Sequence, residues 1–285
     1  MKVLVTGANG QLGRAMQRQA AAHPEHTYCF TDRDELDICS EDDVSRFVGA
    51  MVPDLIVNCA AYTAVDKAEQ DEAKARLLNV AGPANLARAA QEMGASLLHV
   101  STDYVFDGRQ STPYVEEDEP RPLSVYGQTK LDGERAVLTA CGRSMVIRTS
   151  WLYGHGTQNF VQTMLRLGGE REEVRVVFDQ VGTPTYAADL AMVIHVVMER
   201  GVLPGIYHFS NEGVCSWYDF ARAVHRLGGV GHCKLLPIRS CEYPTLATRP
   251  SYTVLDKARI KRTYDLNIPH WEESLERYLN ELKQR

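Results

Sequence analysis

The first half of the chain alternates short, almost wholly apolar runs with longer segments in which apolar residues recur at helical spacing. Strands of this kind, separated by helices, are typical of a parallel sheet that is covered on both faces. We predict strands at residues 2–6, 27–31, 55–59, 96–101 and 145–149, and helices at residues 12–22, 40–51, 77–93 and 126–140. The pattern indicates an α/β protein in which residues 1–150 form a Rossmann-type, doubly wound dinucleotide-binding domain.

The alternation becomes irregular after Trp151. We predict helices at residues 159–167, 187–199, 216–226 and 271–283, but strands only at residues 174–178 and 206–210. Glycine and proline pairs such as Pro204-Gly205 separate these elements. We interpret residues 151–285 as a smaller, mixed and mainly substrate-binding region, from which some segments return to the Rossmann domain.

Composition narrows the classes of function. The 285 residues are 44% hydrophobic and 24% charged, with a net charge of −6 and no basic run, which argues against a nucleic-acid partner. No apolar stretch reaches the roughly 18 residues of a membrane span. The seven cysteines include no C-x-x-C pair, so we expect no zinc site. The chain opens on a strand pattern rather than a signal segment, and we expect a cytoplasmic protein.

A glycine-rich turn follows the first predicted strand and opens the first helix. Such a turn lets backbone N–H groups approach a pyrophosphate, and the helix N-terminus adds partial positive charge. The spacing is G-x-x-G-x-x-G. Its candidate cofactor-binding residues are Gly7, Asn9, Gly10, Gln11, Leu12 and Gly13.

Further cofactor contacts are expected after the second and third strands. Asp32 stands where an acid is expected to bond the adenosine ribose, and its carboxylate favours NADH because it repels a 2′-phosphate. Arg33 offsets that repulsion, so the sequence leaves NADPH and NADH both open as cofactors. The remaining candidates, Asp37 and Ile38 near the adenine and Ala60, Ala61, Tyr62 and Thr63 near the nicotinamide ribose, complete the predicted cofactor site.

Tyr126 and Lys130 form a Y-x-x-x-K motif between the fourth and fifth strands. On a helix the two side chains share one face, and an ammonium beside a phenol lowers its pKa from about 10. Thr102, at the end of the fourth strand, supplies a hydroxyl to the same site. We therefore predict a nicotinamide-dependent oxidoreductase in which Tyr126 donates a proton to an alkoxide, Thr102 hydrogen-bonds the same oxygen, and Lys130 holds the ribose.

Several strings outside these motifs resemble one family of extended short-chain dehydrogenases/reductases. They are TAVDKAE at 63–69, STDYVFDG at 101–108, RTSWLYG at 148–154, NFV at 159–161, DQVGTPT at 179–185 and RPSYTVLD at 249–256. Together they are similar to dTDP-4-dehydrorhamnose reductases, over almost the whole chain. The resemblance implies reduction of dTDP-4-dehydro-6-deoxy-L-mannose to dTDP-L-rhamnose, the last step of dTDP-rhamnose synthesis.

The resemblance also implies a set of substrate-binding residues. Tyr126, Thr102, Asp103, Tyr104 and Trp151 are expected to line the sugar pocket. Thr63, Val65 and Lys67 are expected near the sugar and the nicotinamide. Arg148, Asn159, Gln180 and Arg249 are expected on the nucleotide diphosphate side, where an arginine gives a bidentate pair to phosphate.

The sequence departs from the family pattern in one respect. Some members carry two glutamates that help to hold magnesium at a dimer interface, and alanines, Ala15 and Ala188, stand at those places here. We therefore expect no metal, no metal-bridged dimer, and a monomer.

Two other functions fit part of the pattern. The regulatory subunit of methionine adenosyltransferase resembles this family and binds a dinucleotide without sugar turnover, but the intact Tyr126/Lys130 pair weighs against that role. A nucleotide-sugar epimerase or dehydratase has the same fold, but a dehydratase favours an acid pair, whereas Tyr104 follows Asp103 here.

Overall fold

A six-stranded sheet organises the chain, which the computed structural model describes at residues 1–156 and 158–284. Every pairing in it is parallel, and the strand order is β10-β5-β4-β3-β1-β2. The strands are β1 (Lys2–Thr6), β2 (Thr27–Thr31), β3 (Leu55–Asn58), β4 (Ser96–Thr102), β5 (Ser144–Thr149) and β10 (Gly205–His208). The predicted α/β fold with a Rossmann-type doubly wound sheet is therefore confirmed.

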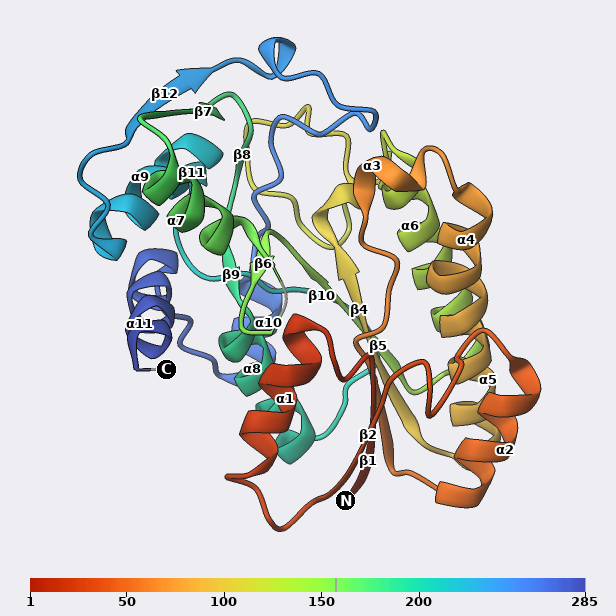
Figure 1. Ribbon diagram of the computed structural model, residues 1–285. Coiled ribbons are helices and arrows are strands. Elements are labelled where there is room, and N and C mark those ends of the chain that lie inside the picture. The colour runs from red at the N-terminus through yellow and green to blue at the C-terminus, as the bar shows by residue number, and fades with distance from the viewer. Residues whose placement is uncertain (157, 285) are drawn as a thin grey trace.

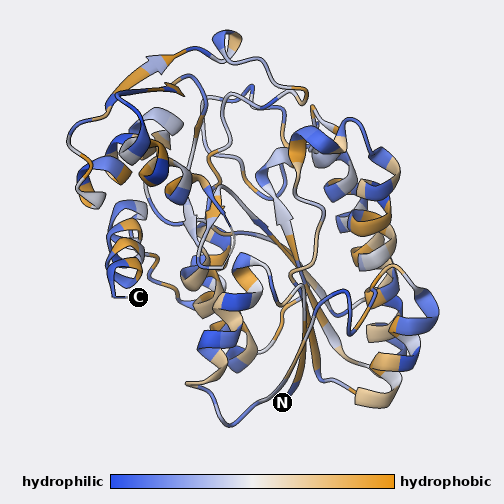
Figure 2. Cartoon of the chain, viewed as in Figure 1, coloured by the Kyte–Doolittle hydropathy of each residue, from blue (hydrophilic) through white to orange (hydrophobic). Residues whose placement is uncertain are grey.

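Helices cover both faces of this sheet (Figure 1). One layer contains α1 (Gln11–Ala20), α8 (Ala187–Arg200) and α10 (Ala258–Tyr264), and the other contains α2 (Glu41–Met51), α5 (Gly82–Met93) and α6 (Val125–Ala140). Alternate strand residues supply two separate cores, with Val3, Val5 and Ile147 in one and Leu4 and Ile56 in the other. This two-sided burial explains why the strands are apolar at nearly every position, as their colour in Figure 2 shows.

The second half builds a smaller body beside the sheet around its own apolar cluster. It contains α7 (Phe160–Glu170), α9 (Trp217–Gly228) and α11 (Trp271–Lys283). Its short strands pair as β12 (Lys234–Ile238) with β7 (Glu173–Val177), β11 (Cys215–Ser216) with β8 (Val181–Gly182), and β6 (Leu152–Tyr153) with β9 (Thr185–Tyr186). None of the helices in the described ranges is both long and apolar enough to cross a bilayer.

Parts of the second half lie in the first. Strand β10 pairs with β5 at the sheet edge, and α8 packs beside α1. Residues beyond 150 therefore complete the Rossmann layers, while the functional division at residue 150 stays a prediction.

Some elements differ from the sequence pattern. The single helix expected at residues 77–93 begins as a π-helical segment, η1 (Leu77–Ala81), before α5. Two short helices, α3 (Val65–Ala68) and α4 (Glu72–Arg76), precede it, and the short 3₁₀ segments η2 (Asp103–Val105) and η3 (Ser240–Glu242) also lay outside the pattern. Segments this short carry too few apolar positions to reveal a period.

A buried ion pair joins α6 to β5. Arg148 Nη2 lies 2.8 Å from Glu134 Oε2, and the two side chains are 2% and 1% exposed. Arg148 Nε also donates to Glu134, and Ser101 Oγ donates to Glu134 Oε1 at 2.5 Å. Several hydrogen bonds thus compensate both charges for the loss of water.

Replacing Arg148 by Met should lower the free energy of unfolding by about 3–5 kcal/mol, because it leaves the Glu134 carboxylate buried without its partner. Urea unfolding followed by circular dichroism measures this loss. The control is Arg166→Met, whose exposed pair with Glu170 contributes less than about 1 kcal/mol. Equal losses in the two variants would contradict the role given to the buried pair.

Candidate active site

The glycine turn after β1 leaves no space for side chains. Gly7 has φ +66°, and a Cβ there would lie 2.6 Å from the backbone nitrogen of Ala60. A Cβ on Gly13 would lie 2.3 Å from the carbonyl oxygen of Gly7. The backbone of β1, α1 and the end of β3 therefore approach one another closely, which is the geometry that a pyrophosphate-binding turn requires.

A cavity of about 370 Å³ lies beside this turn. It brings together eight of the predicted cofactor residues, namely Gly7, Gly10, Asp32, Arg33, Asp37, Ile38, Ala60 and Ala61. Sequence reasoning missed its other lining residues, among them Thr6, Leu36, Lys74 and Leu77. They come from β1, the segment after β2, α4 and η1, and only the fold brings these parts of the chain to one cavity.

The other predicted cofactor residues support the turn or lie beside it. Asn9 donates its backbone N–H to Asp32 Oδ2 at 2.9 Å, which fixes that carboxylate next to the glycines. Leu12 is buried in the core. Gln11, Gly13, Tyr62 and Thr63 are not among the residues that line the cavity.

The Y-x-x-x-K pair lies on the first turns of α6. Ser124 caps this helix by accepting the backbone N–H of Gly127 at 3.2 Å. The Tyr126 ring packs edge-on against Tyr104, and the Thr102 hydroxyl lies close enough to the Tyr126 hydroxyl to affect its pKa. Burial raises the pKa of Tyr126 to about 12, and the negative charge of Asp103 adds to the rise while the Thr102 hydrogen bond opposes it.

Lys130 is almost completely buried and faces β4. Its Nζ donates to the carbonyl of Val100 at 2.7 Å and lies 3.3 Å from His99 Nε2. Burial lowers the pKa of Lys130 to about 8, while Glu134 acts in the opposite direction. The lowering of the tyrosine pKa that we expected from Lys130 does not appear here, because the ammonium group is directed at the strand.

Asp103 is a buried carboxyl group between Thr102 and Tyr104. Its Oδ1 accepts from Thr102 Oγ1 at 3.0 Å, while its buried Oδ2 has no hydrogen-bond partner among the described residues. Burial raises the pKa of Asp103 to about 6, and the nearby hydroxyls of Thr253 and Thr102 oppose the rise. The site therefore offers a free acceptor or, when protonated, a donor.

A second cavity, of about 960 Å³, opens between α7, β7 and the loop that carries Arg249. Arg171, Arg175 and Arg249 line it together with Glu173 and Glu242, and Arg175 is paired with Glu242. Phe160 and Trp217 give it flat apolar walls. The predicted residues Gln180 and Arg249 both line it. This combination of groups suits a ligand with phosphates and a planar ring.

Comparison with known proteins decides the family. A family model described as the RmlD substrate binding domain matches residues 1–284. The dTDP-4-dehydrorhamnose reductase of Aggregatibacter actinomycetemcomitans is 41% identical over 286 residues, which cover 96% of this chain and 97% of that protein. The chain belongs to the dTDP-4-dehydrorhamnose reductase family.

Solved structures of this family agree with the fold. A dTDP-4-dehydrorhamnose reductase from Clostridium acetobutylicum has a TM-score of 0.95 and 44% identity, covering 99% of this chain and 100% of that one. The dTDP-4-dehydrorhamnose reductase of Bacillus anthracis, solved in complex with NADP, has a TM-score of 0.95 and 41% identity, covering 98% of this chain and 99% of that one.

Two residues that the family resemblance placed near the diphosphate lie elsewhere. Arg148 is buried in its pair with Glu134, and Asn159 is buried where it caps α7 and donates to the Gly154 carbonyl. Neither lines the arginine-containing cavity. Their charge and polarity looked ligand-directed because the sequence does not show that a neighbouring element, α6 for Arg148 and the chain just before α7 for Asn159, supplies a partner.

The remaining family-derived positions line neither of the two cavities. Trp151 stacks on Trp217 with ring centroids 3.6 Å apart, so it supports the wall of the second cavity. Thr63 and Lys67 are exposed, and Val65 begins the short helix α3.

Asp66, on α3, was missed although it binds one of the predicted residues. Its Oδ1 and Oδ2 accept from Arg249 Nη1 and Nη2 at 3.1 and 2.7 Å. The Arg249 hydrogen bond is the main reason that the pKa of Asp66 is lowered. The pair links the Rossmann half to the C-terminal loop, which no local pattern in the sequence could indicate.

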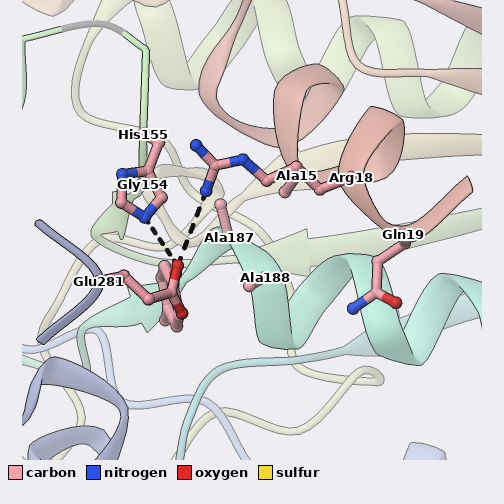
Figure 3. Close-up of a pocket in the computed structure, with 9 residues that line it drawn as sticks. Ala15, Arg18, Gln19, Gly154, His155, Ala187, Ala188 and Glu281 are labelled. Carbon is pink, nitrogen blue, oxygen red and sulfur yellow. Dashed lines mark hydrogen bonds and ion pairs between the residues drawn. The ribbon is translucent and has the colours of Figure 1, made fainter. Parts of the chain in front are cut away.

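Ala15 and Ala188, which stand where some family members carry magnesium-binding glutamates, line one pocket (Figure 3). The other residues of this pocket show whether magnesium could bind there. Its one carboxylate is Glu281. Glu281 Oε2 already lies 2.9 Å from His155 Nε2 and from the Tyr186 hydroxyl, and 3.7 Å from Arg18 Nη1. A carboxylate held by a cation and two polar hydrogens is a poor ligand for magnesium, so these residues do not fit the ion.

The raised pKa of Asp103 predicts a pH-dependent contribution to stability. An acid whose folded pKa lies above its unfolded value near 4 stabilises the fold fully below pH 4, and that contribution is lost as the pH rises through about 6. A shift of about two units corresponds to about 3 kcal/mol.

The parent should therefore lose stability between pH 4 and pH 7.5, whereas Asp103→Asn has no such acid to titrate. The free energy of unfolding of Asp103→Asn minus that of the parent should increase by up to about 3 kcal/mol over this range. Urea unfolding at both pH values measures it. Asp118→Asn is the matched control, because Asp118 lies in a surface loop. A difference between Asp103→Asn and the parent that is the same at both pH values would contradict the assignment.

Proposed function

We propose that this protein reduces the C4 keto group of dTDP-4-dehydro-6-deoxy-L-mannose with NADPH or NADH, giving dTDP-L-rhamnose. The observation that carries the proposal is the clustering of Tyr126, the Thr102 hydroxyl and Lys130 at the carboxyl edge of the sheet, where β4 ends and α6 begins. Family membership supports the nucleotide sugar, because relatives of about 40% identity bear the reductase name.

The first cavity fits a dinucleotide. Gly7 and Gly13 have no side chains to block the backbone N–H groups where the pyrophosphate would lie. The backbone N–H of Asn9 holds the Asp32 carboxylate beside them. Asp32 would accept the ribose hydroxyls, while Arg33 and Lys74, which line the same cavity, would attract a 2′-phosphate. The NADP complex of the Bacillus anthracis relative agrees with use of NADP(H).

A bound reduced nicotinamide supplies the hydride that reaches C4. The chain supplies the rest of the reaction. Tyr126 donates its hydroxyl proton to the developing alkoxide, so that one hydride and one proton convert the ketone to the alcohol. The Thr102 hydroxyl would hydrogen-bond the same oxygen. Lys130 would hold the ribose hydroxyls once its ammonium turns from the Val100 carbonyl, and its charge would then favour the tyrosinate that remains.

The second cavity would hold the nucleotide diphosphate. Arg249 and Gln180 contact the phosphates in this arrangement, and Arg249 would exchange its Asp66 partner for them. Asp103 offers its free Oδ2 to a sugar hydroxyl. The other sugar-side positions, Thr63, Val65, Lys67, Tyr104 and Trp151, keep the roles that the family resemblance implies.

Tyr126→Phe should retain cofactor binding and lose reductase turnover by about 100-fold or more, because it removes the proton donor and little else. The measurement is loss of reduced-nicotinamide absorbance with the dTDP-4-keto-L-sugar, run with NADPH and NADH in parallel. Tyr252→Phe is the control, because Tyr252 lies outside the proposed catalytic group.

Two results would count against the proposed reaction. Turnover of Tyr126→Phe within a few-fold of the parent would remove the tyrosine from it. Dinucleotide binding by the parent without oxidation would favour another nucleotide sugar, an epimerase-type reaction or a regulatory binding subunit.

The oligomeric state and metal requirement form a separate part of the proposal. We expect no need for metal, because Ala15 and Ala188 supply no ligand and Glu281 is already paired. Without a bridging metal we expect a monomer, and we expect it to work in the cytoplasm. Turnover and elution volume should be the same with a chelator as with magnesium. Activity that is lost with chelator and restored by magnesium, or a dimer that needs magnesium, would refute it.

A further inference from the structure

A polar chain runs through the sheet behind the catalytic lysine. It starts at Thr6 on β1, passes through Asn58 on β3 and His99 on β4, and ends at Lys130 on α6. Thr6 Oγ1 lies 2.7 Å from Asn58 Oδ1, Asn58 Nδ2 lies 3.0 Å from His99 Nδ1, and His99 Nε2 lies 3.3 Å from Lys130 Nζ. All four side chains are buried, so water does not replace any of these contacts.

The orientation of the Asn58 amide is fixed by a backbone group. The N–H of Ala60 donates to Asn58 Oδ1 at 3.1 Å, and the Thr6 hydroxyl donates to the same oxygen. The oxygen therefore faces β1 and the turn, and the amide nitrogen faces the imidazole. Because an amide N–H₂ only donates, His99 Nδ1 must accept.

The imidazole is thereby held in one tautomer. Burial and the neighbouring Lys130 charge lower the pKa of His99 well below its ordinary value, so the ring is neutral. A neutral ring that accepts at Nδ1 carries its hydrogen on Nε2. That hydrogen points at Lys130 Nζ, and an ammonium has only donors, so a charged Lys130 places N–H against N–H.

We propose that His99 is a positioning residue for Lys130: held by Asn58 with its hydrogen on Nε2, it donates to the lysine nitrogen and favours the uncharged amine. This inference rests on the proposed reductase function for its catalytic consequence. Since the charged lysine is the form that assists Tyr126, His99 sets an upper pH limit on the reaction.

Two other groups near His99 and Lys130 affect the charge state of the lysine or accept its hydrogens. Glu134, one helical turn beyond Lys130, favours the ammonium, but its carboxylate is shared with Arg148 and Ser101. Val100 accepts one lysine hydrogen in either charge state. The tautomer of His99 is therefore the element that opposes the charge, together with burial, which lowers the pKa of Lys130 to about 8.

Asn58→Asp reverses this arrangement with almost no change of shape. When the new carboxylate is ionised, one oxygen can still accept from Ala60 and Thr6, while the other faces His99 Nδ1 and requires a hydrogen there. The Nε2 atom then becomes an acceptor for the ammonium. The pH at which Lys130 titrates should rise by about one unit or more.

The experiment uses the whole protein labelled with ¹⁵N-histidine and ¹³Cε-lysine and followed by NMR across pH. In the parent, the hydrogen should reside on His99 Nε2, and in Asn58→Asp it should reside on Nδ1 while the Lys130 titration moves upward. The upper limb of the pH profile of sugar reduction should move with it.

The added carboxylate also attracts the Lys130 ammonium directly, apart from its effect on the His99 tautomer. Introducing Asn58→Asp into a His99→Phe variant measures the direct attraction alone. The upward shift caused by Asn58→Asp should shrink to less than half when the imidazole is absent. A shift of full size without His99, or a parent His99 with its hydrogen on Nδ1, overturns the inference. The parent tautomer requires no variant, so misfolding of Asn58→Asp does not remove the test. A parent that shows the expected tautomer and reduces no sugar refutes the proposed function instead.

Discussion

The close packing of α6 against η2, at the end of β4, and against η1 is the constraint on which the site depends. A Cβ on Gly127 would lie 2.2 Å from the carbonyl oxygen of Tyr104, and one on Gly133 would lie 2.0 Å from that of Asn79. Only a helix without side chains at these two points can come so near. The same approach buries Lys130 and Glu134 against the sheet, so α6 presents these two charges to strand residues and not to water.

Burying those charges requires partners, and the partners determine how each group behaves. Glu134 is matched by Arg148 through more than one hydrogen bond, so it stays a structural anchor. Lys130 has a carbonyl and an imidazole but no direct carboxylate, and its pKa falls. Asp103 has a hydroxyl on one oxygen only, and its pKa rises. Where compensation is complete the residue holds the fold, and where it is partial the residue is available for chemistry.

The C-terminal half contributes by joining its ligand-facing groups to the Rossmann half. Arg249 reaches α3 through Asp66, and Trp151 stacks on Trp217. Strand β10 extends the sheet itself. A nucleotide sugar held by such a surface would contact residues from both halves, which fits the position of the reacting tyrosine at the carboxyl edge of the sheet.

The sequence by itself determined the strands β1 to β5, the glycine turn and the Tyr126/Lys130 spacing, because these depend on local periodicity and on the backbone freedom of glycine. Tertiary structure decided the rest. It buried Arg148 and Asn159, which looked ligand-directed, and it paired Arg249 with a carboxylate 183 residues away. It also placed His99 against Lys130. Such contacts arise only when elements remote in the chain pack together, and the charge state of each buried group follows from those contacts.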